Sequence, residues 1–165
     1  MALDLVSTAA ASNANTYCDL DDANQYHEER LHAEIWTAAA VETRKAALVW
    51  AARLLDMHAD WEGVPWTSGQ ALRWPRAGVY DPDGRALAHD AIPTFLKHAA
   101  AELARHLISE DRTAEPDTLG FKTMKVDTIS LTVDKYFQRR TLPASVRAMI
   151  APYVSGAGGR RLVRG

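Results

Sequence analysis

The sequence predicts a mainly α-helical fold: a small helical bundle with a β-hairpin and with extended N- and C-terminal arms. Two stretches repeat apolar residues at the spacing of an amphipathic helix, and a third alternates apolar and polar residues as a pair of strands does. The 165 residues are 47% hydrophobic and 24% charged, so the chain can bury a core. The single cysteine excludes an internal disulfide, and no apolar run approaches the roughly 20 residues that span a bilayer.

The N-terminal part of the chain is predicted to be an arm followed by two helices. Residues 1–16 are small and polar and form the arm. Asp19 occupies the position of a helix N-cap, and the short helix after it is expected to end near Leu31. The strongest helical pattern runs from Ala38 to His58 and predicts the central helix of the bundle. Its apolar stripe consists of Val41, Leu48, Ala52 and Leu55, widened by Ala47, Trp50, Ala51 and Leu54.

The helical core is predicted to span residues 17–109 and to contain a long irregular segment. Residues 59–92 are rich in proline and glycine, which end the helical pattern. Three tryptophans lie in this segment, so we expect it to be packed rather than free. Pro93 then begins a helix that runs to about Ile108.

The remaining residues are predicted to form a hairpin, a last helix and a C-terminal arm. Within residues 110–154, the stretch 121–133 alternates apolar and polar residues over two short runs and predicts a β-hairpin. A last helix follows from Ala144 to about Val154. Residues 155–165 begin with a glycine-rich hinge and are interpreted as a docking arm.

Charge is distributed unevenly along the chain. The 19 basic and 21 acidic side chains give a net charge of −2, which argues against a protein wholly devoted to coating nucleic acid. Residues 1–34 hold seven acids and one base, whereas residues 135–165 hold seven bases and no acid. Opposite charge at the two ends favours contacts between copies or with an oppositely charged partner, and a simple solvated surface is the alternative.

No pattern in the sequence predicts catalysis. His98, Glu102 and His106 are spaced i, i+4, i+8 and are the best metal-binding candidate, but His98 and Glu102 lie on the polar helix face with Arg105 and fit a solvated face better. Cys18 is interpreted as a small packed side chain. No nucleophile or phosphate-binding motif occurs. The expectation is a protein that is not an enzyme, with no catalytic residues, no cofactor and no metal.

A nucleic-acid-binding surface is one interpretation of the tryptophan-rich segment. Its tryptophans, Trp61, Trp66 and Trp74, alternate with Arg73 and Arg76. Aromatic rings can stack on bases while arginines hold phosphates. The alternative is that the tryptophans pin the segment to the core, and several acids nearby weaken any positive groove.

The C-terminal residues suggest a different kind of contact, with another protein. Arg160, Arg161 and Arg164 flank Leu162 and Val163 behind the glycine hinge. Such a segment cannot fold alone, but on a partner its apolar pair could fill small pockets while the arginines pair with carboxylates.

Several sequence blocks resemble a known family. The most specific are Gln70-Ala-Leu-Arg-Trp-Pro-Arg76 and Gly78-Val-Tyr-Asp-Pro-Asp-Gly84, and Lys45-Ala-Ala-Leu48, Ile92-Pro93 and Pro152-Tyr153 also fit. Together they resemble the DnaT-like single-stranded-DNA-binding proteins of phages and prophages. The resemblance covers the chain from about Tyr17 onward and omits residues 1–14. That family is similar in layout to the head–tail connector, or adaptor, proteins of tailed phages and gene transfer agents.

The connector similarity implies a structural virion protein at the head–tail junction. Such proteins form a dodecameric ring that joins the portal protein to a tail-side neck or tail protein, and duplex DNA passes through the lumen without specific binding. On this interpretation the protein assembles in the bacterial host cytoplasm, without a membrane. Tyr153 and residues 160–164 would dock on the portal. The alternative function is a single-stranded-DNA-binding accessory protein that uses Trp61, Trp66, Arg73, Trp74 and Arg76.

Overall fold

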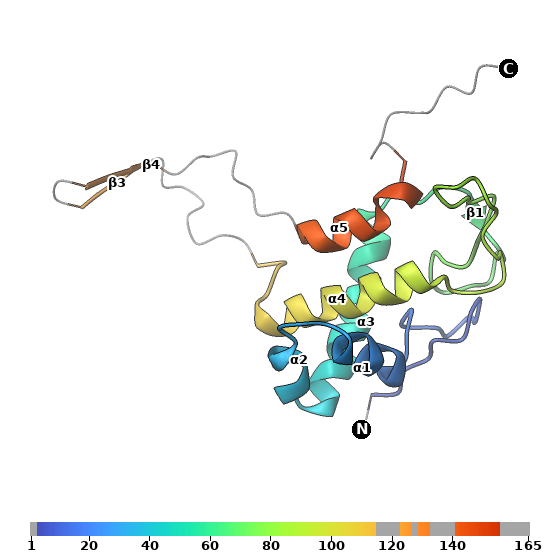
Figure 1. The fold of residues 1–165 in the computed structure, drawn as a ribbon, viewed down its shortest axis with the longest axis horizontal. Coiled ribbons are helices and arrows are strands. Elements are labelled where there is room, and N and C mark those ends of the chain that lie inside the picture. Colours follow the sequence, from blue (N-terminus) through green and yellow to red (C-terminus); the bar gives the residue numbers. More distant parts are fainter. Residues whose placement is uncertain (1–2, 115–122, 127–128, 133–140, 156–165) are drawn as a thin grey trace, which may run out of the picture.

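The computed structural model describes residues 3–114, 123–126, 129–132 and 141–155, and these confirm a mainly helical protein with a small two-stranded hairpin (Figure 1). None of the helices in these ranges is long and apolar enough to cross a membrane. The elements in chain order are α1 (Leu20–Glu28), α2 (Glu34–Ala38), α3 (Val41–His58), β1 (Val64–Pro65), β2 (Arg76–Ala77), α4 (Thr94–Ser109), β3 (Thr123–Val126), β4 (Ile129–Thr132), α5 (Ala144–Ile150) and a 3-10 turn (Ala151–Tyr153).

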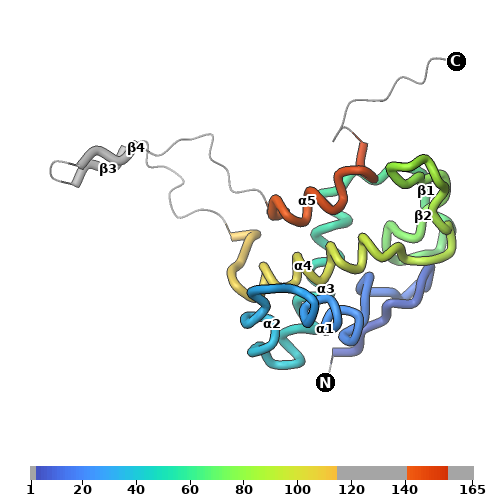
Figure 2. Tube along the Cα trace, viewed as in Figure 1, coloured from blue at the N-terminus to red at the C-terminus, as the bar shows by residue number. Residues whose placement is uncertain are grey.

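Helix α4, rather than α3, is the centre of the bundle. It packs against α1, α2, α3 and α5, and α3 is its main partner (Figure 2). The buried side of α4 is rich in alanine, which lets the neighbouring helices approach closely. The sequence predicted α3 as the central helix because its apolar stripe is wide, but one side of α3 is exposed to solvent. The buried residues of α4 are Leu96, Ala99, Ala100, Ala101, Glu102, Leu103 and Ala104.

The N-terminal residues fold onto the bundle. Asn15 closes a loop with Val6: the Val6 N–H donates to the Asn15 side chain at 2.8 Å, and the Asn15 N–H donates to the Val6 carbonyl at 2.9 Å. The Asp19 side chain caps α1 by accepting from the N–H of Asp22, as the sequence predicts. The helix ends at Glu28, earlier than expected.

The irregular segment between α3 and α4 is packed against the core. Strand β1 pairs antiparallel with β2, with Val64 opposite Ala77. The close pairing requires glycine at position 63, because Gly63 has φ of +69° and a Cβ there would lie 2.2 Å from the Ala77 carbonyl oxygen. The β1–β2 pairing therefore fixes the conformation of a segment in which the sequence showed only turn-forming residues.

A series of aromatic contacts joins this segment to α4 and to the 3-10 turn. Trp61 meets Trp74 edge-on with ring centroids 5.6 Å apart, and Trp74 meets Phe95 in the same way at 5.6 Å. Phe95 then stacks on Tyr153 at 3.7 Å. The aromatic side chains thus join the irregular segment to the first turn of α4, through Phe95, and to the 3-10 turn, through Tyr153.

The hairpin predicted near residue 121 consists of β3 and β4. The two strands pair antiparallel, with Thr123 opposite Thr132 and Val126 opposite Ile129.

Candidate nucleic-acid interface

Two of the three tryptophans predicted to contact nucleic acid are buried. The exposed fractions are 4% for Trp61 and 1% for Trp74. A base cannot stack on either ring while the segment keeps this conformation. Both residues belong to the core, which was the alternative interpretation of their sequence pattern.

Arg76 is also unavailable to phosphates. Its guanidinium donates to four backbone carbonyls: those of Glu62 at 2.6 Å, Gly63 at 2.7 Å, Arg73 at 3.1 Å and Trp61 at 3.3 Å. Burial and the nearby positive charge of Arg73 lower its pKa. The side chain is only 7% exposed and holds the segment in shape. Its predicted role in binding nucleic acid is therefore replaced by a structural one.

Trp66 and Arg73 remain exposed, as an interface requires. Trp66 is 45% exposed, and its ring lies against the exposed His89 imidazole with centroids 3.9 Å apart and an interplanar angle of 45°. The Trp66 N–H donates to the Pro75 carbonyl at 3.0 Å, which closes the loop that carries Arg73. The imidazole thus contacts the indole at a tilt.

Asp56 attaches this loop to α3. Its carboxylate accepts from the N–H of Arg73 at 3.0 Å and from the buried hydroxyl of Tyr17. Burial raises the pKa of Asp56, and the hydrogen bonds from Tyr17 and Arg73 offset only part of that rise. Burial and the adjacent Asp56 charge also raise the pKa of Tyr17 well above its usual value. The three residues fix Arg73 beside the last two turns of α3.

The outer side of α3 carries an aromatic and cationic strip that the sequence analysis missed. Trp50 is 38% exposed, and the Arg53 guanidinium lies 5.9 Å from the centre of its ring. Met57, one turn further on, is 68% exposed. Sequence periodicity assigned Trp50 to the buried stripe, whereas the i, i+3, i+7 spacing of these residues places them on one outer face.

Together these residues form what we call the aromatic–arginine track: Trp50, Arg53, Arg73, Trp66 and His89. Arg53 and Asp56 are one turn apart on α3, and Asp56 bonds to Arg73. The bond between Asp56 and Arg73 therefore joins the two parts of the track, the one on α3 and the one on the loop. Within the part of the chain that the structure describes, neither Arg53 nor Arg73 makes an ion pair.

The part of the chain that the structure describes is acidic. The described ranges contain 12 lysines and arginines and 17 aspartates and glutamates, for a net charge of −5. The other residues contain seven bases and four acids, for a net charge of +3. Most described cations outside the track are held by neighbouring groups, such as Lys97 by Asp22 at 2.8 Å and Arg85 by Asp83 at 3.4 Å.

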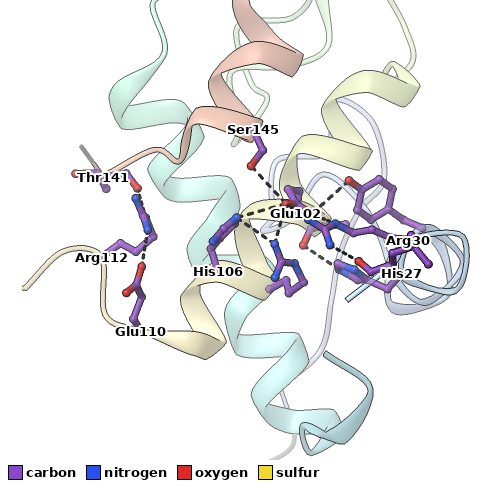
Figure 3. Close-up of polar contacts among 12 residues, drawn as sticks. His27, Arg30, Glu102, His106, Glu110, Arg112, Thr141 and Ser145 are labelled. Carbon is purple, nitrogen blue, oxygen red and sulfur yellow. Dashed lines mark hydrogen bonds and ion pairs between the residues drawn. The ribbon is translucent and has the colours of Figure 1, made fainter. Parts of the chain in front are cut away.

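Glu102, the centre of the metal-binding candidate, is a buried ion-pair hub (Figure 3). Arg30 from beyond the end of α1 contacts both of its oxygens, at 2.7 and 2.9 Å. Arg105 contacts it at 2.9 Å, His106 at 3.3 Å and the Ser145 hydroxyl of α5 at 3.4 Å. The expected solvated face is wrong at this position, because α1 and α5 cover it.

The Glu102 carboxylate is held by cations of the protein itself. Burial alone would raise the pKa of Glu102, but the hydrogen bonds and charges of Arg105 and Arg30 outweigh it and lower the pKa to about 2. His98 packs against Tyr26 at 4.9 Å instead of approaching the carboxylate. No group of three metal-ligating side chains occurs among the described residues.

Two further sequence predictions concern Cys18 and the C-terminal residues. Cys18 is fully buried, as predicted, and burial raises the pKa of its thiol to about 12. Tyr153 was predicted to dock on a partner, but it stacks on Phe95 and its carbonyl accepts from the Glu62 N–H at 3.0 Å. The predicted docking residues Arg160, Arg161, Leu162, Val163 and Arg164 lie outside the described residues.

Comparison with known proteins corrects the main functional prediction. A family model described as "Putative DnaT-like ssDNA binding protein" matches residues 1–165, including the first 14 that the sequence resemblance omitted. No curated protein and no solved structure matches the chain. The match fits the alternative interpretation, and the prediction of a head–tail connector is wrong. That connector prediction was also the basis for the portal and tail partners, the dodecameric ring and the virion location. No comparison supports them.

Proposed function

We propose that this protein binds single-stranded DNA along the aromatic–arginine track and acts as a non-catalytic accessory protein. The chain belongs to the family of DnaT-like single-stranded-DNA-binding proteins. The observation that carries the proposal is the track itself. It presents two exposed indole rings, those of Trp50 and Trp66, together with two exposed arginines, Arg53 and Arg73, that make no ion pair with a described residue. This is the combination of flat rings and cations that holds an unpaired strand.

The track suits a single strand rather than a duplex. Stacking on an indole requires an exposed base face, and only unpaired bases offer one. Every base has such a face, so stacking gives affinity with little sequence preference. The described residues of the track include no asparagine or glutamine that could read a base edge.

The small number of unpaired arginines sets the expected salt dependence. Each phosphate neutralised on a single strand changes the slope of log K against log salt by about −0.7. Arg53 and Arg73 together should therefore contribute about −1.4 to the slope. Such a shallow slope fits binding in which stacking supplies much of the free energy.

Fluorescence anisotropy with a labelled oligo(dT) tests the proposal on the full chain. Trp50→Ala and Trp66→Ala should each weaken binding by about 5- to 150-fold, the usual effect of removing one stacked base. The double variant Arg53→Ala/Arg73→Ala should make the salt slope shallower by about 1.4. Arg85→Ala is the matched control, because Arg85 is an exposed arginine of the same segment that is already paired with Asp83.

Two outcomes would contradict the proposal at different levels. If the wild-type chain fails to bind oligo(dT) even at low salt, the proposed function is wrong. If it binds and all three track variants bind as tightly as the wild type, the strand lies elsewhere on the protein.

A further inference from the structure

A pocket of about 530 Å³ lies between the C-terminal end of α3 and the side of α5. Its volume is within the range of small-molecule sites, about 300–1,000 Å³. The pocket is open to solvent along the exposed side of α5, where Arg147 and Ala148 lie. Its lining consists of His58, Ala59, Asp60, Leu142, Ala144, Arg147, Ala148, Ile150, Ala151, Val154 and Ser155.

The lining combines an apolar wall with one basic side chain, Arg147, and one acidic side chain, Asp60. Leu142, Ile150 and Val154 supply flat hydrophobic surface. Arg147 is exposed and makes no ion pair with any described residue. A guanidinium in this state can form paired hydrogen bonds with a phosphate. Asp60 adds an acceptor for an amino group.

The pocket lies on the same helix as part of the proposed DNA track. Its lining residue His58 is the last residue of α3, the helix that carries Trp50 and Arg53. One helix therefore carries both the strip with Trp50 and Arg53 and, at its C-terminal end, the pocket. The remaining lining residues come from α5 and its flanks, so the pocket extends the surface onto a second element.

We propose that this pocket holds one nucleotide of the bound strand, with its phosphate at Arg147 and its base against the apolar wall. The proposal rests on the proposed function, because it assigns a place to one nucleotide of the same strand. An aromatic base fits an apolar wall, and Arg147 supplies the positive charge that a phosphate needs. Cytosine suits the site because Asp60 can accept from its amino group.

Titration of the full chain with dCMP, followed by backbone NMR, tests the pocket apart from the track. The amide signals of Ala144, Ala148 and Ser155 should shift, and deoxycytidine without its phosphate should bind more weakly by about tenfold or more. Arg147→Ala should weaken dCMP binding by about the same factor and leave deoxycytidine binding unchanged. Ala148→Phe should block both ligands by filling the pocket from an exposed position.

Control variants separate this proposal from the previous one. Trp66→Ala should leave dCMP binding unchanged while weakening oligo(dT) binding, and Arg85→Ala should change neither. The pocket proposal is overturned if dCMP shifts other signals only, if Arg147→Ala binds dCMP like the wild type, or if dCMP does not bind at all. In each case oligo(dT) binding that still depends on Trp66 would leave the proposed function intact.

Discussion

Replacing Glu102 with glutamine should destabilise the bundle in a way that depends on pH. The Glu102 carboxylate is 1% exposed and joins Arg30, Arg105 and the α5 hydroxyl of Ser145. Glutamine keeps the shape of the side chain but removes its charge. Two arginines, with side chains 28% and 12% exposed, would then lose their shared counter-ion.

The expected magnitude follows from the pKa of Glu102. The pKa falls from the ordinary 4.5 to about 2, which corresponds to about 3 kcal/mol of stability at neutral pH. A carboxylate with a lowered pKa stabilises the folded state fully above its unfolded-state pKa. That contribution is lost as pH falls from about 4.5 through about 2.

Urea unfolding between pH 7 and pH 2 measures this difference. Glu102→Gln should lower the free energy of unfolding by about 3 kcal/mol at pH 7, and the gap to the wild type should close as pH approaches 2. Glu42→Gln is the control, because Glu42 is exposed: its carboxylate pairs with Lys45 at 3.0 Å and accepts from the Leu3 N–H at 3.2 Å. A gap that stays constant with pH, or that is no larger for Glu102→Gln than for Glu42→Gln, would refute the argument.

Three further substitutions test other contacts of the fold. Burial lowers the pKa of His27 to about 4, so wild-type stability should fall between pH 6.5 and pH 4, and His27→Phe should remove this step in a stability–pH profile. Gly63→Ala should lower the melting temperature more than Gly78→Ala, because both have positive φ but only Gly63 has a carbonyl 2.2 Å from the added Cβ. Arg76→Lys should cost about 1–3 kcal/mol and speed amide exchange in β1 and β2, since lysine cannot reach all four carbonyls.

Local patterns in the sequence were sufficient to predict most helices and one cap. The helical spacing gave α3 and α4 to within a few residues, because periodicity is written in consecutive residues. Asp19 was recognisable as a cap because its partner, Asp22, lies three residues away. The early end of α1 at Glu28 was not predictable in the same way, since the helical pattern continues past it.

The errors concern which faces other elements cover. The helical pattern places Glu102 on the polar face with Arg105, yet its cation Arg30 is 72 positions away, so no local pattern reveals that pairing. The prediction for Trp50 was wrong in the opposite direction. The sequence predicts a buried side chain, but nothing in the described structure covers it fully. Periodicity divides a helix into faces, whereas tertiary packing decides which face meets solvent.

For the candidate site, the sequence identified Trp66 and Arg73 but could not separate them from their buried neighbours. Trp74 follows Arg73 directly, yet one is in the core and the other is exposed. Trp74 packs against Trp61 and Phe95 in the core, whereas the Arg73 N–H bonds to Asp56 at the end of α3 and the Arg73 side chain stays exposed. That bond joins positions 17 residues apart and has no signature in the sequence.

The acidic surroundings of the track bear on its proposed preference for single strands. A duplex presents one phosphate charge per about 1.7 Å of axis and no free base face, so the described residues, with a net charge of −5 in a chain whose net charge is −2, repel it without compensation from stacking. A single strand can offset the same repulsion at Trp50 and Trp66, where stacking contributes about 1–3 kcal/mol per base. Arg53 and Arg73 then need to hold only the phosphates between the two rings. On this proposal the negative charge around the track favours unpaired DNA, because it weakens every contact that lacks a stacked base.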